Sequence, residues 1–372
     1  MALPLPDLLP DNTSPRCPHF GECGGCRLQM MDYSSQLALK QEIISGLLER
    51  DVPIIGSPDP YGYRHRMDYI TAFGKVGLRK RGDGKSVVNL GECHLVRPKV
   101  SELIPQIREW IEEFNIRGYN IVTNRGDLRY LTFRHALSSD ELMIVLVTSS
   151  QETNIQPLLE RLQDHAESVV WSVQSRTGDD SHGDVMQVLG QETVTQTVLG
   201  FDFEISPNCF FQNNLLLIDG MFEEIVRHVQ GYTMDLFCGT GTIGLAAAHK
   251  AERVLGVEVM EENIRLALRN AKRNDIGNAE FVTDNANHFL AFYEGDTPDT
   301  VIVDPPRSGL APKFIRKLNR LEADRIVYVS CNPKTYLDDL RQLESYELKE
   351  AVAFDMFPQT PHAELVTLLE RK

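Results

Sequence analysis

The second half of the chain alternates short apolar strands with helices, and this alternation limits the possible folds most strongly. After Pro207 we expect strands near residues 233–237, 254–259, 280–283, 300–303 and 326–330, with helices between most of them. Two more strands, near residues 348–354 and 364–369, follow one another without a helix. Regular alternation of this kind predicts a doubly wound, mostly parallel sheet. The last two strands should pair antiparallel at its edge.

A glycine-rich turn follows the first of these strands and begins a helix. Gly239, Gly241 and Gly244 match the spacing G-x-G-x-x-G, and Glu258 ends the next strand. Glycines allow the backbone to approach a cofactor closely, and a carboxylate at this offset accepts hydrogen bonds from ribose hydroxyls. The motif alone does not separate a dinucleotide from S-adenosylmethionine. A glycine turn that serves packing only is the structural alternative.

Three side chains that could react lie at the ends of strands. Asp304 precedes two prolines after an apolar strand, Cys331 follows another strand, and Glu364 begins the last one. In an open α/β sheet, the carboxyl ends of the strands are where substrates bind. A desolvated glutamate has a raised pKa that suits it to general-base work. The alternatives are a strand-ending turn, a buried apolar cysteine and a satisfied edge residue.

Four of the seven cysteines are better explained as metal ligands than as core residues or disulfide partners. They are Cys17, Cys23 and Cys26, in the pattern C-x5-C-x2-C, and Cys93. Four thiolates match an iron–sulfur cluster or a structural zinc ion. The spacing favours the cluster, whereas His19 or His94 could complete a zinc site. Because the start of the chain does not resemble a secretory signal, we expect no disulfide framework.

Charge and hydropathy restrict the partners. The net charge of −15 argues against a surface that coats nucleic acid nonspecifically. Residues 61–85 nevertheless hold seven Lys and Arg against two Asp, which fits a selective RNA contact or an ordinary solvated hairpin. No apolar run approaches the roughly 18 residues of a membrane span. We therefore expect a cytoplasmic, monomeric protein that binds no membrane.

With 372 residues, the chain is long enough for several domains. We expect an N-terminal segment, residues 1–95, that carries the cysteine loop and the basic strands. Residues 96–205 form a predicted central α+β domain that binds RNA. Residues 206–372 form the predicted doubly wound domain with the glycine turn.

The order of these motifs closely resembles that of the RNA uracil-5-methyltransferase family. Three further runs carry the resemblance, namely residues 63–66, residues 206–214 and the ending His362-x-Glu364. The resemblance covers nearly all of the chain beyond residue 16. It implies a Rossmann-like class I methyltransferase domain, S-adenosylmethionine as methyl donor, and a uridine in structured RNA as substrate.

The resemblance also assigns roles to individual residues. Addition of the Cys331 thiolate to C6 of uracil would make C5 nucleophilic, and Glu364 would later remove the C5 proton. By family similarity, the cofactor site should be lined by Gln212, Phe237, Glu258, Asn285 and Asp304, with Gly239 in the glycine turn. The cysteine loop would hold a structural [4Fe-4S] cluster.

The family's subdivisions suggest a substrate. A cysteine loop without an N-terminal OB-like domain is most similar to the group that modifies a hairpin uridine of 23S rRNA. A tRNA uracil-5-methyltransferase is the alternative within the family. Three rivals lie outside it: an amino-methyltransferase that needs no thiol, a non-catalytic RNA-binding protein with a vestigial cofactor fold, and a redox protein with a dinucleotide.

Overall fold

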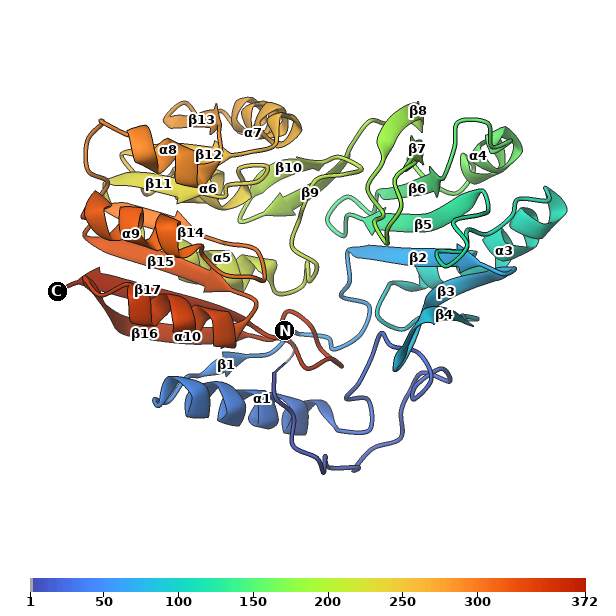
Figure 1. Cartoon of the computed structure of the whole chain (residues 1–372), viewed down its shortest axis with the longest axis horizontal. Coiled ribbons are helices and arrows are strands. Elements are labelled where there is room, and N and C mark those ends of the chain that lie inside the picture. Colours follow the sequence, from blue (N-terminus) through green and yellow to red (C-terminus); the bar gives the residue numbers. More distant parts are fainter. Residues whose placement is uncertain (1–2) are drawn as a thin grey trace.

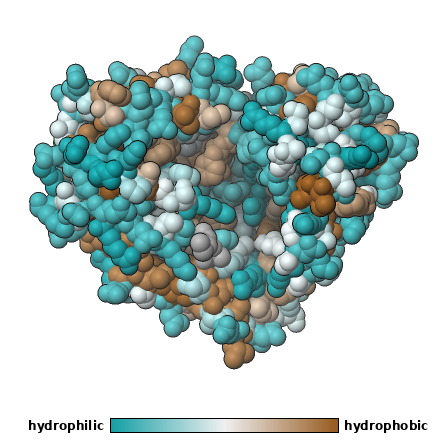
Figure 2. Space-filling model, in the orientation of Figure 1, coloured by the Kyte–Doolittle hydropathy of each residue, from teal (hydrophilic) through white to brown (hydrophobic). Residues whose placement is uncertain are grey.

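The protein forms two lobes, each built on a large sheet, in a computed structural model that describes residues 3–372 (Figure 1). One lobe contains the eight strands β1-β16-β17-β15-β14-β11-β12-β13, in that spatial order. The other contains the seven strands β4-β3-β2-β5-β6-β7-β8. A hollow separates the two lobes on the face shown in Figure 2. No helix among residues 3–372 is both long enough and apolar enough to cross a membrane.

The eight-stranded sheet confirms the predicted doubly wound fold. Its strands from the second half of the chain are β11 (Tyr232–Leu236), β12 (Arg253–Glu258), β13 (Ala279–Thr283), β14 (Thr300–Val303), β15 (Arg325–Ser330), β16 (Tyr346–Phe354) and β17 (Glu364–Arg371). The accompanying helices are α5 (Ile218–Arg227), α6 (Thr242–Ala247), α7 (Glu261–Arg273), α8 (Ala286–Phe292), α9 (Pro312–Leu321) and α10 (Pro333–Gln342). Every residue of β14 is buried, as expected for a parallel strand covered on both faces.

The last two strands pair antiparallel as predicted, but they do not form the edge of the sheet alone. β17 lies between β15 and β16, and β1 (Ile54–Ile55) pairs parallel with β16 as the outermost strand. A strand from the first sixty residues therefore completes the sheet of the second half. Its two residues carry too little pattern to predict this pairing.

The second lobe combines strands from both sides of residue 95. Its strands are β2 (Arg66–Ala72), β3 (Lys75–Lys80), β4 (Asp83–Asn89), β5 (Leu128–His135), β6 (Leu142–Thr148), β7 (Ser168–Val173) and β8 (Asp184–Gly190). Its helices are α2 (Pro98–Ser101), α3 (Leu103–Glu113) and α4 (Gln156–Leu162). The basic strands β2–β4 thus share one sheet with the central strands β5–β8. A hairpin of β9 (Val194–Val198) and β10 (Phe201–Ile205) follows this lobe in the chain.

Residues 121–124, between α3 and β5, form a turn. The side-chain oxygen of Asn120 accepts hydrogen bonds from the backbone nitrogens of Val122 (2.8 Å) and Thr123 (3.2 Å). An asparagine that bonds the backbone two residues ahead competes with strand pairing.

The first part of the chain contacts both lobes. Helix α1 (Tyr33–Leu48) lies along the eight-stranded sheet at the bottom of Figure 1, and Asp32 caps its first turn. The cysteine loop instead reaches the second lobe, where the nitrogen of Gly24 donates to the oxygen of Arg79 at 2.9 Å. Just beyond the loop, the nitrogen of Arg27 donates to the oxygen of Gln359 at 2.8 Å.

Candidate active site

The candidate site lies where the strand order of the eight-stranded sheet reverses, at the carboxyl ends of β11 and β14. From β11 the chain proceeds outward through β12 and β13, whereas β14 and β15 extend the sheet in the opposite direction. Helices leave the sheet on opposite sides of such a point, so a crevice forms there. The glycine turn follows β11, and Asp304 follows β14.

The glycine turn adopts backbone conformations that its glycines permit. Gly239 and Gly241 have φ of 54° and 77°. A Cβ atom at Gly241 would lie 2.9 Å from the ring of Phe281, so larger residues do not fit. The nitrogen of Gly239 donates to Oε2 of Glu258 at 3.2 Å, which places the predicted ribose-binding carboxylate against the turn.

Two predicted cofactor residues meet across the crevice. Nε2 of Gln212 donates to Oδ2 of Asp304 at 3.4 Å. Phe237, with φ of 74°, packs against Phe314 with ring centroids 5.3 Å apart. Asn285 lies farther out, because its exposed side chain caps α8 by accepting from the nitrogens of residues 287 and 288.

Asp235, the last residue but one of β11, is a buried carboxylate that sequence reasoning did not single out. Its exposed fraction is 1%, and its Oδ2 has no hydrogen-bond partner among the described residues. Burial, with a smaller contribution from the neighbouring Asp304, raises its pKa to about 7. Burial raises the pKa of Asp304 to about 7 as well. An aspartate inside an apolar strand, just before a glycine turn, was the available signal.

The two residues predicted to react are neighbours across an antiparallel strand pair. Ser330 pairs with Leu365 between β15 and β17, so Cys331 and Glu364 come next along the two chains. Opposed residues of an antiparallel pair project to the same face of the sheet. Glu364 is 5% exposed and Cys331 is half-buried.

The surroundings of this pair disfavour negative charge in the ligand-free protein. Burial raises the pKa of the Cys331 thiol to about 11, and Glu364 and Asp304 add to the rise while Arg307 opposes it. Burial also raises the pKa of Glu364 well above its ordinary value. A cationic ligand in this crevice would be favoured by the carboxyl groups and would favour the thiolate.

The loops that carry Cys331 and Asp304 are bonded to one another. Nδ2 of Asn332, which is 3% exposed, donates to the backbone oxygen of Arg307 at 3.1 Å. Pro333 then begins α10 at the position where a missing N–H costs nothing. The nucleophile candidate is thereby held beside the turn that ends β14.

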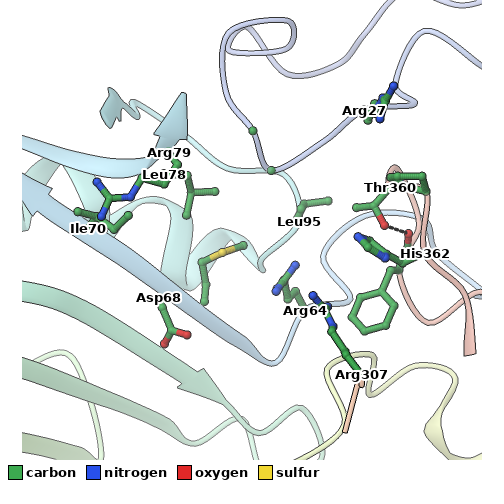
Figure 3. A pocket seen from close by; sticks show the side chains of 15 residues that line it. Arg27, Arg64, Asp68, Ile70, Leu78, Arg79, Leu95, Arg307, Thr360 and His362 are labelled. Carbon is green, nitrogen blue, oxygen red and sulfur yellow. Dashed lines mark hydrogen bonds between the residues drawn. The ribbon is translucent and has the colours of Figure 1, made fainter. Parts of the chain in front are cut away.

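A pocket of about 500 Å³ lies between the two lobes and the cysteine loop, and it is lined by Arg307 and by His362, two residues before Glu364 (Figure 3). Figure 3 shows Arg64, Arg307 and His362 on one side of it, and Arg79 on the other. Arg79 pairs with Asp179 at 2.7 Å, whereas the guanidinium of Arg64 donates only to the backbone oxygen of Arg66 in the described structure. Arginines that line a cavity without carboxylate partners suit a phosphate-bearing ligand.

The four predicted metal ligands line one small apolar cavity. Cys17, Cys23, Cys26 and Cys93 all border it. All four thiols are free, and two of them are buried. His19 and His94 border the same cavity. Burial raises the pKa of the Cys26 thiol to about 12, so an unligated group would stay protonated. The chemistry of the donor set therefore fits a thiolate-bound metal centre.

A crevice of this kind on a doubly wound sheet, with a cysteine and a glutamate beside it, fits an S-adenosylmethionine-dependent methyltransferase, and comparisons with known proteins agree. The family profile described as tRNA (Uracil-5-)-methyltransferase matches residues 130–372. The chain belongs to this family and is an S-adenosylmethionine-dependent RNA (uracil-C5) methyltransferase.

The relatives are similar over almost the whole chain. A tRNA (uracil(54)-C(5))-methyltransferase of Pyrococcus furiosus is 37% identical over 363 residues, 97% of this chain and 86% of the relative. The enzyme of the same name from Pyrococcus horikoshii is 39% identical over 356 residues, 95% of this chain and 85% of the relative. A crystal structure of the Pyrococcus abyssi tRNA (uracil-54, C5)-methyltransferase with S-adenosyl-L-homocysteine superimposes with a TM-score of 0.82 at 33% identity, covering 93% of this chain and 86% of that one.

These comparisons do not support the expected preference for 23S rRNA. The relatives described above are named for tRNA, which agrees better with the alternative substrate. The expectation of a ribosomal substrate rested on architecture alone, a cysteine loop without an OB-like domain, and the names of these relatives favour tRNA instead.

Proposed function

We propose that this enzyme methylates C5 of uridine 54 in tRNA, with Cys331 as the nucleophile and Glu364 as the base. Support for the substrate comes from the names of relatives that are 36–39% identical over at least 95% of the chain. The adjacency of Cys331 and Glu364 across β15 and β17, beside the cofactor crevice, is the observation that carries the mechanism.

The reaction begins when the Cys331 thiolate forms a bond to C6 of the flipped-out uracil. The electrons of the C5–C6 double bond move onto C5 and O4 as an enolate, and C5 becomes nucleophilic. S-adenosylmethionine supplies an electrophilic methyl group, which C5 takes while S-adenosylhomocysteine leaves. The carboxylate of Glu364 then removes the C5 proton. The electrons of that C–H bond restore the double bond as the C6–S bond breaks and the thiolate departs.

In this proposal, each cofactor residue contacts a different part of S-adenosylmethionine. Glu258 accepts from the ribose hydroxyls, and Gln212 with Asp304 borders the methionine end beside Cys331. Phe237 and Gly239 form the wall next to β11, and Asn285 contributes at the rim of the crevice. The buried carboxyls of Asp235 and Asp304 favour the positive sulfonium.

We also propose that the lobe around residues 96–205, with the basic strands of residues 1–95, binds the tRNA, and that residues 206–372 carry out catalysis. The arginine-lined pocket lies between these parts, which supports the division of labour. An acidic protein with a confined basic pocket recognises one RNA region and does not coat the whole polyanion.

The cysteine group holds a [4Fe-4S] cluster in this proposal, and zinc is the less favoured alternative. Tetrahedral zinc with Zn–S bonds near 2.3 Å keeps its sulfurs only about 3.8 Å apart. Among the described residues, no three of these four sulfurs all lie within 4.8 Å of one another. The wider spacing supports the larger cluster, whose duty would be to hold the loop against both lobes.

The mechanism is tested with Cys331→Ala and Glu364→Gln on a tRNA transcript and labelled S-adenosylmethionine. We expect Cys331→Ala to form no protein–RNA adduct, and Glu364→Gln to accumulate methylated tRNA bound to the protein on denaturing gels. Equal, mild losses in both variants would contradict these roles. Two further RNAs are controls for substrate specificity: a tRNA transcript with cytidine at position 54 and a 23S rRNA hairpin. Preferential methylation of the hairpin would contradict the tRNA assignment.

A further inference from the structure

A lysine–aspartate pair is buried away from the reacting atoms, at the junction of α1 with the second half of the chain. Nζ of Lys40 lies 2.6 Å from Oδ1 of Asp355, and both side chains are 0% exposed. Replacing such a pair with apolar residues is often neutral or stabilising, because two charges lose their hydration. Stability alone is therefore a weak reason for placing a charge pair here.

All hydrogen bonds of the Lys40 side chain in the described structure reach one segment, residues 355–363, which connects β16 to β17. Besides Asp355, Nζ donates to the backbone oxygens of Phe357 (3.2 Å) and His362 (2.9 Å). An ammonium has three N–H donors, and all three are used within this segment. Asp355 directly follows β16, and His362 precedes Glu364 by two residues. Lys40 therefore holds both ends of the segment that leads to the base.

Helix α1 and the residues just after the cysteine loop also bond to the middle of the segment 355–363. Gln36 and Gln359 bond to one another twice. Nε2 of Gln36 donates to Oε1 of Gln359, and the backbone nitrogen of Gln359 donates to Oε1 of Gln36, both at 3.0 Å. The oxygen of Gln359 accepts from the nitrogens of Arg27 (2.8 Å) and Leu28 (3.0 Å). Gln359 has φ of 68°, a left-handed conformation that persists only where surrounding contacts impose it.

We propose that Lys40 is a positioning residue that sets the direction of the Glu364 carboxylate through the segment 355–363. The inference rests on the proposed function, in which Glu364 removes the C5 proton. Cys331 is carried by the loop between β15 and α10, to which the Lys40 side chain makes no hydrogen bond in the described structure. Loss of Lys40 should therefore slow proton removal and release of the thiolate more than it slows adduct formation. A misplacement of about 1 Å at a reacting group costs on the order of a hundredfold in rate.

The test compares the two halves of a single turnover. Lys40→Met together with Asp355→Asn removes both charges, so no unpaired charge remains buried. With tRNA transcript and labelled S-adenosylmethionine, we expect the rate of adduct formation to stay within about threefold of the parent enzyme. The methylated covalent adduct should persist at least about tenfold longer. Gln36→Met, which carries no charge change, should prolong it to a smaller extent.

Controls separate this inference from the function on which it rests. Lys250→Met is the matched control, since Lys250 donates to backbone oxygens of residues 226 and 227 at the end of α5, away from the segment. It should leave both rates unchanged. If adduct formation and adduct release slow equally in the double variant, the positioning role is wrong. It is also wrong if both rates stay unchanged in the double variant and in Gln36→Met. If Glu364→Gln itself accumulates no adduct, the assignment of the base has failed instead.

Discussion

The buried carboxyl groups of Asp235 and Asp304 favour a cationic ligand in the crevice, because the described structure places no opposite charge beside either of them. Asp235 and Asp304 share a desolvated space, and each has a pKa raised to about 7. Cys331 and Glu364 lie beside them with raised pKa values of their own. Because burial is the largest cause in each case, a bound sulfonium would lower these values by supplying the missing opposite charge.

Asp235→Asn tests this at the residue scale. The folded-state pKa of Asp235 exceeds its ordinary value of 3.8, so its protonated form contributes stability below about pH 4 that is lost as the pH rises through about 7. We expect the ligand-free parent to have a lower Tm at pH 8 than at pH 5.5. At pH 8, the free energy of unfolding of the ligand-free Asp235→Asn variant should exceed that of the parent by roughly 1–2 kcal/mol.

The same substitution should weaken the binding of S-adenosylmethionine, because a neutral amide no longer attracts the sulfonium. Calorimetric titration and thermal melts at both pH values measure the two effects. A variant that melts lower than the parent at pH 8 would show that the carboxylate is compensated in the free protein. Cys238 adjoins the same turn but is no carboxyl group, so Cys238→Ser is a control that should not change the pH dependence.

At the scale of elements, the N-terminal segment connects parts of the molecule that the chain order separates. The cysteine loop bonds to β3 through Gly24, and the residues just after it bond to Gln359 before β17. Helix α1 then holds the same segment through Lys40. A metal centre in the loop would therefore stabilise contacts with both lobes without entering the chemistry.

The colour and metal content of the protein test this element. Prepared without oxygen, the protein should be brown and absorb near about 400 nm, as thiolate-ligated iron–sulfur centres do. Cys26→Ser should lose most of the iron, whereas Cys209→Ser, which alters a buried cysteine outside the group, should keep it. A colourless protein containing one zinc ion per chain would overturn the cluster in favour of the alternative.

At the scale of the whole molecule, several arginines gather in one pocket of an acidic protein. The net charge is −15, yet the pocket between the lobes is lined by arginines from three separate parts of the chain, namely Arg27, Arg64, Arg79 and Arg307. Three of the seven basic residues within 61–85 are paired with carboxylates, namely Arg66, Arg79 and Lys80. We expect the RNA backbone to contact this arginine-lined pocket.

Arg64→Gln should weaken tRNA binding through this pocket. We expect a higher KM for tRNA and a dependence of log KM on log salt that is shallower by about one unit, since one phosphate contact is lost. The Kd for S-adenosylmethionine should not change. Lys85→Gln, at an exposed position of β4 outside the pocket, is the matched control. An unchanged salt slope in Arg64→Gln would place the RNA elsewhere.

The amino-acid sequence by itself determined the doubly wound sheet, the glycine turn and the strand-end positions of Asp304, Cys331 and Glu364. These features depend on local periodicity and on short motifs, which a chain carries wherever its elements finally pack. The parallel strands place their carboxyl ends together as a consequence of topology. Their residues therefore meet in space as the order of motifs predicts.

Only the tertiary structure decided which distant segments share an interface. It placed β1 beside β16, joined strands on both sides of residue 95 in one sheet, and set α1 against the segment before Glu364. It also desolvated Asp235, whose burial depends on what packs over it. Such contacts are selected by the fit of whole faces and by burial across hundreds of residues, and no local pattern records the partner.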